Sequence, residues 1–382
     1  MSARTLLFLR EISEIEYVLP DQTNGIYLRE EVVRGPARQV TVIGQNSGKN
    51  EDENWLVFER PVSVPDSDAK VRVELAFQLE IRIDDDTEYI ARTKDTPLVV
   101  YFPTEKATML GFLMQGPYKT TPARDNIPKD DEWNTKLVGE TGQLLSDVLL
   151  HIKDLGLLTV SFLETLPVRM GDFPENSMFY PIIDAVRKTL TIKDILPADD
   201  GTFIAAQNAK LASAEWLRKL LREEQLRQLF QSKTAPKWIS GEITEGAKND
   251  LWKFIRDVLK VEILTPDSFA RKVDSGFFEK QTDEWLSQFY EHLADQKALW
   301  KKWDGWSRGP LSAKSFIRLQ DGKHVPPFQA DGSLNCYLPA GQNSDISLPV
   351  VKTALVQSEK ARHFLAQLGI PELDIVEDVL SS

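Results

Sequence analysis

The sequence predicts an α+β fold, in which a β-rich sheet with covering helices comes first and mostly helical modules with β-hairpins follow. Apolar runs of strand length, separated by turn residues, occupy most of residues 5–115. Near residue 131 the hydrophobic period changes to that of amphipathic helices. Two Asp-Gly turns between short apolar segments recur in the second half of the chain. Strands followed by helices are the order expected of an α+β protein.

The composition is that of a folded globular protein. Of the 382 residues, 42% are hydrophobic and 27% are charged, which is enough apolar material for two or three domain cores. The net charge of −12 opposes contact with phosphate backbones, so nucleic acid is not the expected partner. The single cysteine excludes an internal disulfide, and no apolar run approaches the roughly 18 residues of a membrane span. We therefore expect a cytoplasmic protein with no membrane segment.

Strands are expected at 5–9 with a continuation through 12–19, then at 26–33, 38–43, 55–59, 71–83, 98–102 and 111–115. The segment 71–83 gives the clearest signal, because apolar residues from Val71 to Ile83 alternate with mostly charged ones. This period of two predicts a long strand with one face in the core and the other face in solvent. The run Asp84-Asp85-Asp86 then ends the strand as a solvated turn.

Helices are expected at 131–155, 177–190, 213–230, 248–260 and 283–303, with a start at Thr265-Pro266-Asp267 and a final pair after Ser358 and Pro371. Gly156 is suited to end the first helix, and Ser213 to cap the third. Four segments follow from this order: a β-rich domain at 1–130, a helical layer at 131–190, an α+β module at 191–303, and a second hairpin with C-terminal helices at 304–382.

The two Asp-Gly turns are each expected to close a β-hairpin, in segments 195–204 and 316–325. Gly201 and Gly322 supply the positive φ that a tight two-residue turn requires. Asp-Gly turns are common, so these are either two unrelated hairpins or parts of two related α+β modules.

Several segments resemble catalytic motifs but have simpler explanations. The run from Gly44 to Asn50 lacks the glycine spacing and the hydroxyl residue of a phosphate-binding loop, so we interpret it as a polar hairpin tip. The four histidines are scattered, and Asp130-Asp131-Glu132 suits a helix N-terminus better than a metal site. Cys336 has no paired base in the sequence and is expected to be a buried, inert thiol. No cofactor or metal site is therefore predicted in this chain.

A tryptophan-rich segment from Trp300 to Trp306 interleaves aromatic and basic residues. Such a pattern occurs in proteins that bind single-stranded nucleic acid. At helical spacing, however, Trp300 and Trp303 share one face, which favours packing in the core with the lysines in solvent. A third alternative is a protein-binding surface around residues 300–306.

The irregular segment at 101–133 carries two cations, Lys119 and Arg124, between a strand and the start of a helix. Cations in this position can form an anion site, and a solvated connector is the alternative. We expect the Arg124 side chain to lie in solvent, so that its removal leaves the melting temperature nearly unchanged.

This same segment carries a resemblance to a known family. The motifs FPTEK, GFLMQGPYKTTPARDNIP and EWN, with the later LP-x-x-DG, IRL-x-DG-x-HV and FLAQLGIPELDIVEDVL, resemble bacterial sacsin-like ATP-binding proteins. These proteins belong to the GHKL superfamily, which includes DNA gyrase and the ninety-kilodalton heat-shock chaperone. The resemblance extends over nearly the whole chain. It implies a transducer-like sheet with helices, which lies downstream of an ATPase domain.

The family's ATPase domain carries a magnesium-binding Asn and an Asp-x-Gly-x-Gly motif, and neither occurs before residue 100 here. The resemblance therefore implies a fragment, a truncated gene product or a separate subunit, with ATP and magnesium held by the missing domain. It implies a chain that is not itself an enzyme, in which Arg124, or as second choice Lys119, contacts the γ-phosphate. The implied partners are a GHKL-type ATPase domain, a second copy of the chain and an unidentified client protein.

Two other functions remain open at this point. The chain could be a stand-alone interaction subunit of a bacterial defence or repair system. It could also be an enzyme whose catalytic carboxylates carry no familiar motif.

Overall fold

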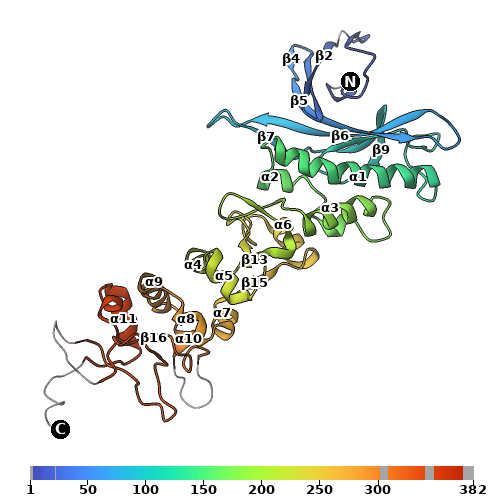
Figure 1. The fold of residues 1–382 in the computed structure, drawn as a ribbon. Coiled ribbons are helices and arrows are strands. Elements are labelled where there is room, and N and C mark those ends of the chain that lie inside the picture. Colours follow the sequence, from blue (N-terminus) through green and yellow to red (C-terminus); the bar gives the residue numbers. More distant parts are fainter. Residues whose placement is uncertain (1–2, 22, 302–308, 340–347, 373–382) are drawn as a thin grey trace, which may run out of the picture. The chain divides into compact units, whose positions relative to one another are not determined.

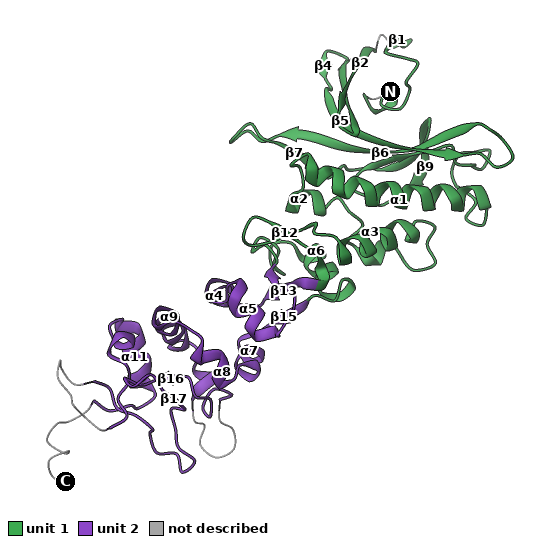
Figure 2. Ribbon diagram, viewed as in Figure 1, with its two compact units in different colours: residues 1–207, 239–261 green, residues 208–238, 262–382 purple. Residues whose placement is uncertain are grey.

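The computed structural model describes residues 3–21, 23–301, 309–339 and 348–372, and it has the predicted α+β architecture (Figure 1). The chain divides into two compact units (Figure 2). Unit 1 comprises residues 1–207 and 239–261, and unit 2 comprises residues 208–238 and 262–382. These boundaries differ from the four consecutive segments expected from the sequence, because the backbone passes from one unit to the other three times.

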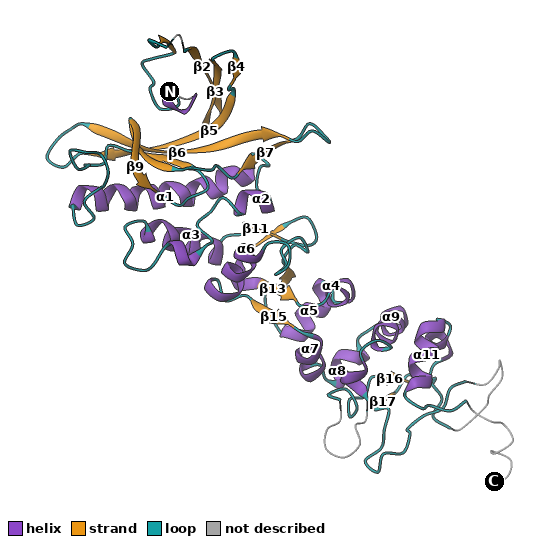
Figure 3. Cartoon of the chain, turned by 180° about the vertical axis from the view of Figure 1, so that it is seen from behind, coloured by secondary structure: helices purple, strands orange, loops and turns teal. Residues whose placement is uncertain are grey.

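Unit 1 is built on a ten-stranded sheet with the order β1-β2-β3-β5-β6-β10-β8-β9, in which β4 also pairs with β3 and β7 with β6. Its strands are β1 (Glu14–Val18), β2 (Asn24–Arg34), β3 (Ala37–Asn46), β4 (Lys49–Asn50), β5 (Glu53–Ser63), β6 (Lys70–Ile81), β7 (Glu88–Ala91), β8 (Pro97–Val100), β9 (Phe102–Ala107) and β10 (Leu113–Gln115). The pairings are antiparallel except that of β8 with β10. Figure 3 shows these strands together near the N-terminus, with helices dominating the later chain.

Helices α1 (Glu132–Asp154) and α2 (Val160–Leu163) cover one face of this sheet. The other helical elements of unit 1 are α3 (Tyr180–Ile192), α6 (Asn249–Lys253), the 3-10 turn η2 (Met170–Asp172) and the π-helical turn η4 (Phe254–Val258). Helix α1 lies against β5 and β6, where Phe58 stacks on His151, and α3 packs against the side of α1 away from the sheet (Figure 1). As predicted, α1 ends before Gly156, which has a φ of 73°.

The N-terminal segment covers the opposite face of the sheet. Residues 5–9 do not form the predicted strand, because a 3-10 helix η1 (Ala3–Thr5) leads into turns. Leu6, Leu7 and Phe8 are nevertheless buried, where they pack with residues such as Trp55 of β5. An apolar run can therefore fill a core without joining the ladder of hydrogen bonds.

This covering also changes the environment of β6. The strand is buried on both faces from Val73 to Phe77, so its even-numbered positions do not all face solvent as predicted. Glu74 in particular is 2% exposed. The predicted strand at 98–102 is likewise two strands, because Tyr101 has a φ of 59° and separates β8 from β9.

Unit 2 consists of short elements around an aromatic core. They are β13 (Ala209–Ala212), α4 (Glu215–Leu220), α5 (Glu223–Phe230), β14 (Lys237–Trp238), β15 (Glu262–Leu264), α7 (Pro266–Lys272), α8 (Ser275–Glu279), α9 (Asp283–Leu293), α10 (Lys297–Trp300), β16 (Ile317–Arg318), β17 (His324–Val325), η5 (Thr353–Val356) and α11 (Glu359–Gln367). A further 3-10 turn, η3 (Ala206–Asn208), spans the first boundary between the units. Phe289 of α9 is fully buried in this core, and its ring lies against those of Phe269, Phe278, Trp285, Tyr290 and Phe316.

Three of the long predicted helices are interrupted. The helix predicted at 213–230 is divided into α4 and α5 at Leu221, whose backbone is extended, and its first cap is Ala214 instead of Ser213. The helix predicted at 283–303 ends at Leu293 and continues only as the short α10. The helix predicted at 248–260 becomes π-helical from Phe254. The helix start at Thr265 is confirmed, since its side chain caps α7.

The two predicted hairpins are present, formed by β11 (Leu196–Pro197) with β12 (Phe203–Ile204), and by β16 with β17. Gly201 and Gly322 have φ values of 78° and 87°, as expected. The loops, however, contain three residues and not two, because Ala198 pairs with Thr202 and Leu319 with Lys323. A type I turn followed by a glycine with positive φ accounts for the extra residue.

The hairpins belong to two copies of one pairing pattern. In the first copy Ile239 returns antiparallel to Ala198, and in the second Val351 returns antiparallel to Leu319. The next residue then donates its N–H to the residue before the bridge, Ser240 to Pro197 and Lys352 to Arg318.

The agreement continues in the strands that follow. In the first copy β13 lies between β14 and β15 and is parallel to both. In the second, residues 337 and 338 form parallel bridges to Val350 and Glu372. These pairings favour two related α+β modules over two unrelated hairpins.

The helices of the two copies differ by one inserted residue. The N-caps Lys248 and Ser358 correspond, as do the buried Phe254 and Phe364 that follow them. After η4, the difference in residue number between corresponding positions is smaller by one than before it. Lys260 there corresponds to Gly369, and both residues have positive φ. The π-helical turn absorbs the extra residue of the first copy.

Candidate functional site

The Arg124 side chain is bonded within its own unit. Its Nη2 donates to the carbonyl oxygens of Val100, at 2.9 Å, and Phe102, at 3.0 Å. The expectation that this guanidinium lies free in solvent is therefore wrong. Its two bonds hold the turn between β8 and β9, which places Tyr101 at the surface.

Lys119 is the more exposed of the two predicted cations. Its side chain is 62% exposed, and Nζ lies 2.9 Å from Oδ2 of Asp131, the N-cap of α1. This bond from Lys119, followed by the backbone bond from Asn134, lowers the pKa of the Asp131 carboxyl. The acidic run 130–132 is therefore a capped helix start, as predicted.

The backbone around Lys119 is fixed by a buried amide. Asn134, on the first turn of α1, accepts from the Lys119 N–H at 2.8 Å and donates to the Lys119 carbonyl at 3.0 Å. It also donates to the carbonyl of Pro128. The segment between the sheet and α1 is thus held at both of its predicted cations and is not a loose connector.

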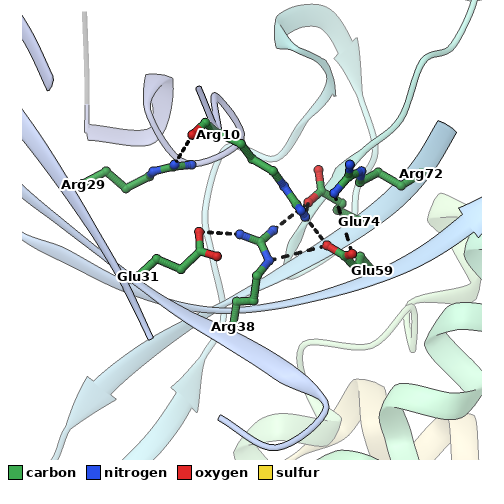
Figure 4. Close-up of polar contacts among 7 residues, drawn as sticks. All are labelled: Arg10, Arg29, Glu31, Arg38, Glu59, Arg72 and Glu74. Carbon is green, nitrogen blue, oxygen red and sulfur yellow. Dashed lines mark hydrogen bonds and ion pairs between the residues drawn. The ribbon is translucent and has the colours of Figure 1, made fainter. Parts of the chain in front are cut away.

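A second group of charges crosses the face of the sheet under the N-terminal segment (Figure 4). It contains four arginines and three glutamates, namely Arg10, Arg29, Arg38, Arg72, Glu31, Glu59 and Glu74, and we call it the arginine–glutamate cluster. Except for Arg10, these residues lie on adjacent strands of the sheet. With four arginines and three glutamates, the cluster carries one net positive formal charge.

The centre of this cluster is a pair of facing carboxylates. Glu59 of β5 and Glu74 of β6 are direct partners across the two strands. Like charges in this position repel, so the pair needs cations. Arg10 donates from one Nη2 to both carboxylates, and Arg38 bonds Glu74 at 2.8 Å.

The pKa values reflect this pairing. Burial alone would lower the pKa of Arg10, but its bonds to Glu59 and Glu74 raise it overall. Burial would raise the pKa of Glu59, but the bond from Arg10 and the charges of Arg38 and Arg72 lower it overall. Arg10 and Glu59 therefore stay ionised near neutral pH, and their ion pair attaches the N-terminal segment to the sheet.

A pocket of about 350 Å³ opens beside this cluster. Its lining includes Arg10, Lys70, Arg72, Glu74, Tyr101 and Gln115. Tyr101 belongs to the turn that Arg124 holds. The predicted cationic segment and the arginine–glutamate cluster thus border the same hollow of unit 1.

The other candidate groups have structural environments. Cys336 is buried, and this burial raises the pKa of its thiol to about 12, as fits an inert residue. His151 stacks on Phe58, His292 stacks on Trp216, and His324 accepts a bond from Arg318. The run from Gly44 to Asn50 is the tip joining β3 and β4, as predicted. Within the described ranges, no group of three or more acidic, histidine or cysteine side chains could hold a metal.

Trp300 packs in the core of unit 2, where its Nε1 donates to the Leu293 carbonyl at 2.7 Å. Trp303 and Trp306 lie outside the described residues, as does the helix predicted after Pro371. Among the described helices, none has the length and apolar character needed to cross a bilayer.

Sequence reasoning found the cationic segment but not the arginine–glutamate cluster. Its arginines and glutamates occupy alternate strand positions, which is the usual pattern of a solvated face. The one sequence feature that could have indicated the cluster is Arg10, a charged residue directly after an apolar run. The chain was also compared with models of protein families, with curated proteins and with solved structures, and none of them matches it.

Proposed function

We propose that this chain is a non-enzymatic transducer and scaffold that works with a GHKL-type ATPase domain in the cytoplasm. The observation that carries the proposal is the construction of the segment between β10 and α1. An exposed lysine stands on a backbone fixed from both sides, beside the N-terminus of a 23-residue helix. A fixed cation at a helix N-terminus is suited to meet phosphate charge presented by another domain.

Within this proposal the two cations have different roles. Lys119 contacts the γ-phosphate, because its side chain is exposed and its only ion-pair partner among the described residues is the partly exposed carboxylate of Asp131. Arg124 positions the segment through the carbonyls of Val100 and Phe102. This assignment reverses the order of preference that the resemblance implied.

The test is ATP turnover with and without an ATPase domain. The chain alone should neither bind ATP with micromolar affinity nor hydrolyse it, as calorimetry and a phosphate-release assay would measure. When a sacsin-like ATPase domain is supplied in cis or in trans, Lys119→Ala should lower turnover roughly tenfold without changing the melting temperature. Tight, magnesium-dependent binding of ATP by the chain alone would refute the proposal.

A stand-alone interaction subunit, as found in bacterial defence or repair systems, is the second candidate. The observation that favours it is a set of exposed apolar side chains on the strands of unit 1, which includes Val33 of β2 at 82% and Ile81 of β6 at 60% exposure. Exposed apolar groups of this kind mark protein-binding surfaces when they are contiguous. Under this alternative, Val33→Asp should abolish partner binding while Lys119→Ala leaves it intact.

A further inference from the structure

The pocket beside the arginine–glutamate cluster has the chemistry of a ligand site. Its volume of about 350 Å³ lies in the range of small-molecule sites, roughly 300–1,000 Å³. The N-terminal segment forms one wall through residues 8–12, and β6 forms another through residues 70–74. Apolar residues of both walls, Phe8, Leu9 and Val71, alternate with charged ones.

The charged groups at the pocket leave an excess of cations. Arg10, Lys70 and Arg72 line it, against the carboxylates of Glu11 and Glu74. Glu74 already bonds Arg10 and Arg38. Lys70 is exposed and forms no ion pair with any described residue. Arg72 forms only a long ion pair among the described residues, with 3.7 Å between its Nη1 and Oε1 of Glu59.

Gln115 supplies an unused acceptor in the same lining. Its side chain is 4% exposed, and its Oε1 has no hydrogen-bond partner among the described residues. A buried acceptor without a partner is costly, so such groups are rare unless a water or ligand supplies the donor. Gln115 pairs with Glu74 across the strands, which places the acceptor next to the cationic wall.

We propose that this pocket binds an amphiphilic oxyanion, meaning a carboxylate or phosphate joined to an apolar body through a hydrogen-bond donor. The oxyanion is held by Lys70 and Arg72, because charge-assisted bonds to such groups are strong. The donor meets Oε1 of Gln115, and the apolar body lies against Phe8 and Leu9. The carboxyl end of a peptide and a nucleotide monophosphate both have this chemistry.

This site is independent of the proposed function, since it requires no ATPase domain and its test uses the chain alone. Either proposal can therefore fail while the other holds. The probes are N-acetyl-leucine as the carboxylate source, adenosine monophosphate as the phosphate source, and inorganic phosphate and N-acetyl-leucinamide as incomplete ligands. Calorimetric titration should extend to about 10 mM, since a single small site can be as weak as millimolar.

We expect one of the two complete probes to bind at least tenfold more tightly than either incomplete probe, which would also identify the source of the oxyanion. Binding of inorganic phosphate as tightly as both complete probes would refute the amphiphilic ligand. Absence of binding by all four probes would refute the site and leave an ordered water as the partner of Gln115.

Three variants locate the site. Gln115→Leu should weaken binding about tenfold yet leave the melting temperature equal or higher, because it removes an unpaired buried acceptor. Lys70→Gln should weaken binding severalfold without loss of stability, since Lys70 is exposed and unpaired among the described residues. Lys49→Gln, at a hairpin tip that does not line the pocket, is the matched control and should bind normally. Equal affinities for all three variants would place the ligand elsewhere.

Discussion

Arg124 combines a strained backbone with two compensating bonds. Its φ of 60° is uncommon for a residue with a Cβ atom. Its guanidinium meets the carbonyls on both sides of Tyr101, another residue with positive φ. Two strained positions therefore support each other, and the side chain of Arg124 is the connection between them.

We predict that Arg124→Ala lowers the free energy of unfolding by about 1–2 kcal/mol, because two hydrogen bonds from a charged donor are lost at a half-buried site. This revises the expectation that the melting temperature would not change. Lys119→Ala is the matched control and should cost less than about 0.5 kcal/mol, since its ion pair is exposed. Urea denaturation of both variants measures the difference, and equal costs would contradict the positioning role.

Whether a residue is charged could be read from the sequence, but its partners could not. The sequence indicated that Arg124 and Lys119 lie between a strand and a helix, and they do. It did not indicate that Arg124 would bond backbone carbonyls 22 and 24 residues away. Backbone acceptors have no sequence signature, since every residue carries a carbonyl group.

At the scale of elements, α1 offers two glycines in different surroundings. A Cβ atom at Gly139 would have no neighbour within 4 Å, whereas one at Gly142 would lie 3.2 Å from the Pro181 carbonyl and 3.3 Å from Cβ of Ala185. Gly142 thus lets α3 approach α1 closely.

We predict that Gly139→Ala raises the free energy of unfolding by about 0.5–1 kcal/mol, the difference in helix propensity between the two residues. Gly142→Ala should lose this gain, because α3 must move to make room. Thermal unfolding followed by circular dichroism would measure both. An equal increase in the free energy of unfolding for Gly142→Ala would mean that α3 can move away from α1 without loss of stability.

The two hairpin glycines allow a test of backbone strain alone. A Cβ atom at Gly201 or at Gly322 would have no neighbour within 4 Å, so a side chain at either position meets open space. Valine should still cost at least about 1 kcal/mol at each position, because positive φ is unfavourable for β-branched residues. Asparagine, which tolerates this conformation, should cost much less. If the valine variants melt like the parent protein, the turn geometry is wrong.

The existence of most elements could be predicted from periodicity, but their interruptions could not. The alternation in β6 and the helical period of α1 are both long and gave nearly correct boundaries. The break between α4 and α5 occurs at Leu221, a residue with high helix propensity. Its backbone carbonyl instead accepts a bond from Trp238 Nε1 at 2.7 Å, so a tertiary contact overrides the local preference.

At the scale of the whole molecule, the α+β order of strands and helices was predictable, whereas the division into units was not. The sequence predicts four consecutive segments, but residues 239–261 return to unit 1 after residues 208–238 have contributed to unit 2. The pairing of Ile239 with Ala198 is one of the contacts that reveal this return. Such a pairing depends on shape and register and leaves no local pattern in the sequence.

Both units should lose stability in acid. The pKa of Glu59 in unit 1 and that of Asp283 in unit 2 are lowered, since in each case bonds to cations outweigh the effect of burial. A lowered folded pKa stabilises the protein above the unfolded value, which is 4.5 for Glu and 3.8 for Asp, and this contribution is lost as the pH falls through the folded value.

We therefore predict that the free energy of unfolding starts to decline below about pH 6.5, because burial lowers the pKa of His292 and His324 in the folded protein, and that it falls steeply below about pH 4. Urea titrations across this range would measure it. Glu59→Gln should be less stable at neutral pH and show a shallower fall in acid, because one of the linked protons is removed. A stability that continued to rise toward pH 3 would contradict the ion pairs assigned here.

The interleaving of the units has a consequence for biosynthesis. The ribosome releases the chain from its N-terminus, so unit 1 cannot be completed until residue 261 has emerged, after the first part of unit 2. At about 5–20 residues per second, the interval between residues 208 and 261 lasts roughly 3–10 seconds. Once Trp238 has been added, β13 and β14 are both present, but β15 has not yet been made. The nascent protein thus passes through a stage with an unpaired strand edge, and this edge is a binding site for a chaperone.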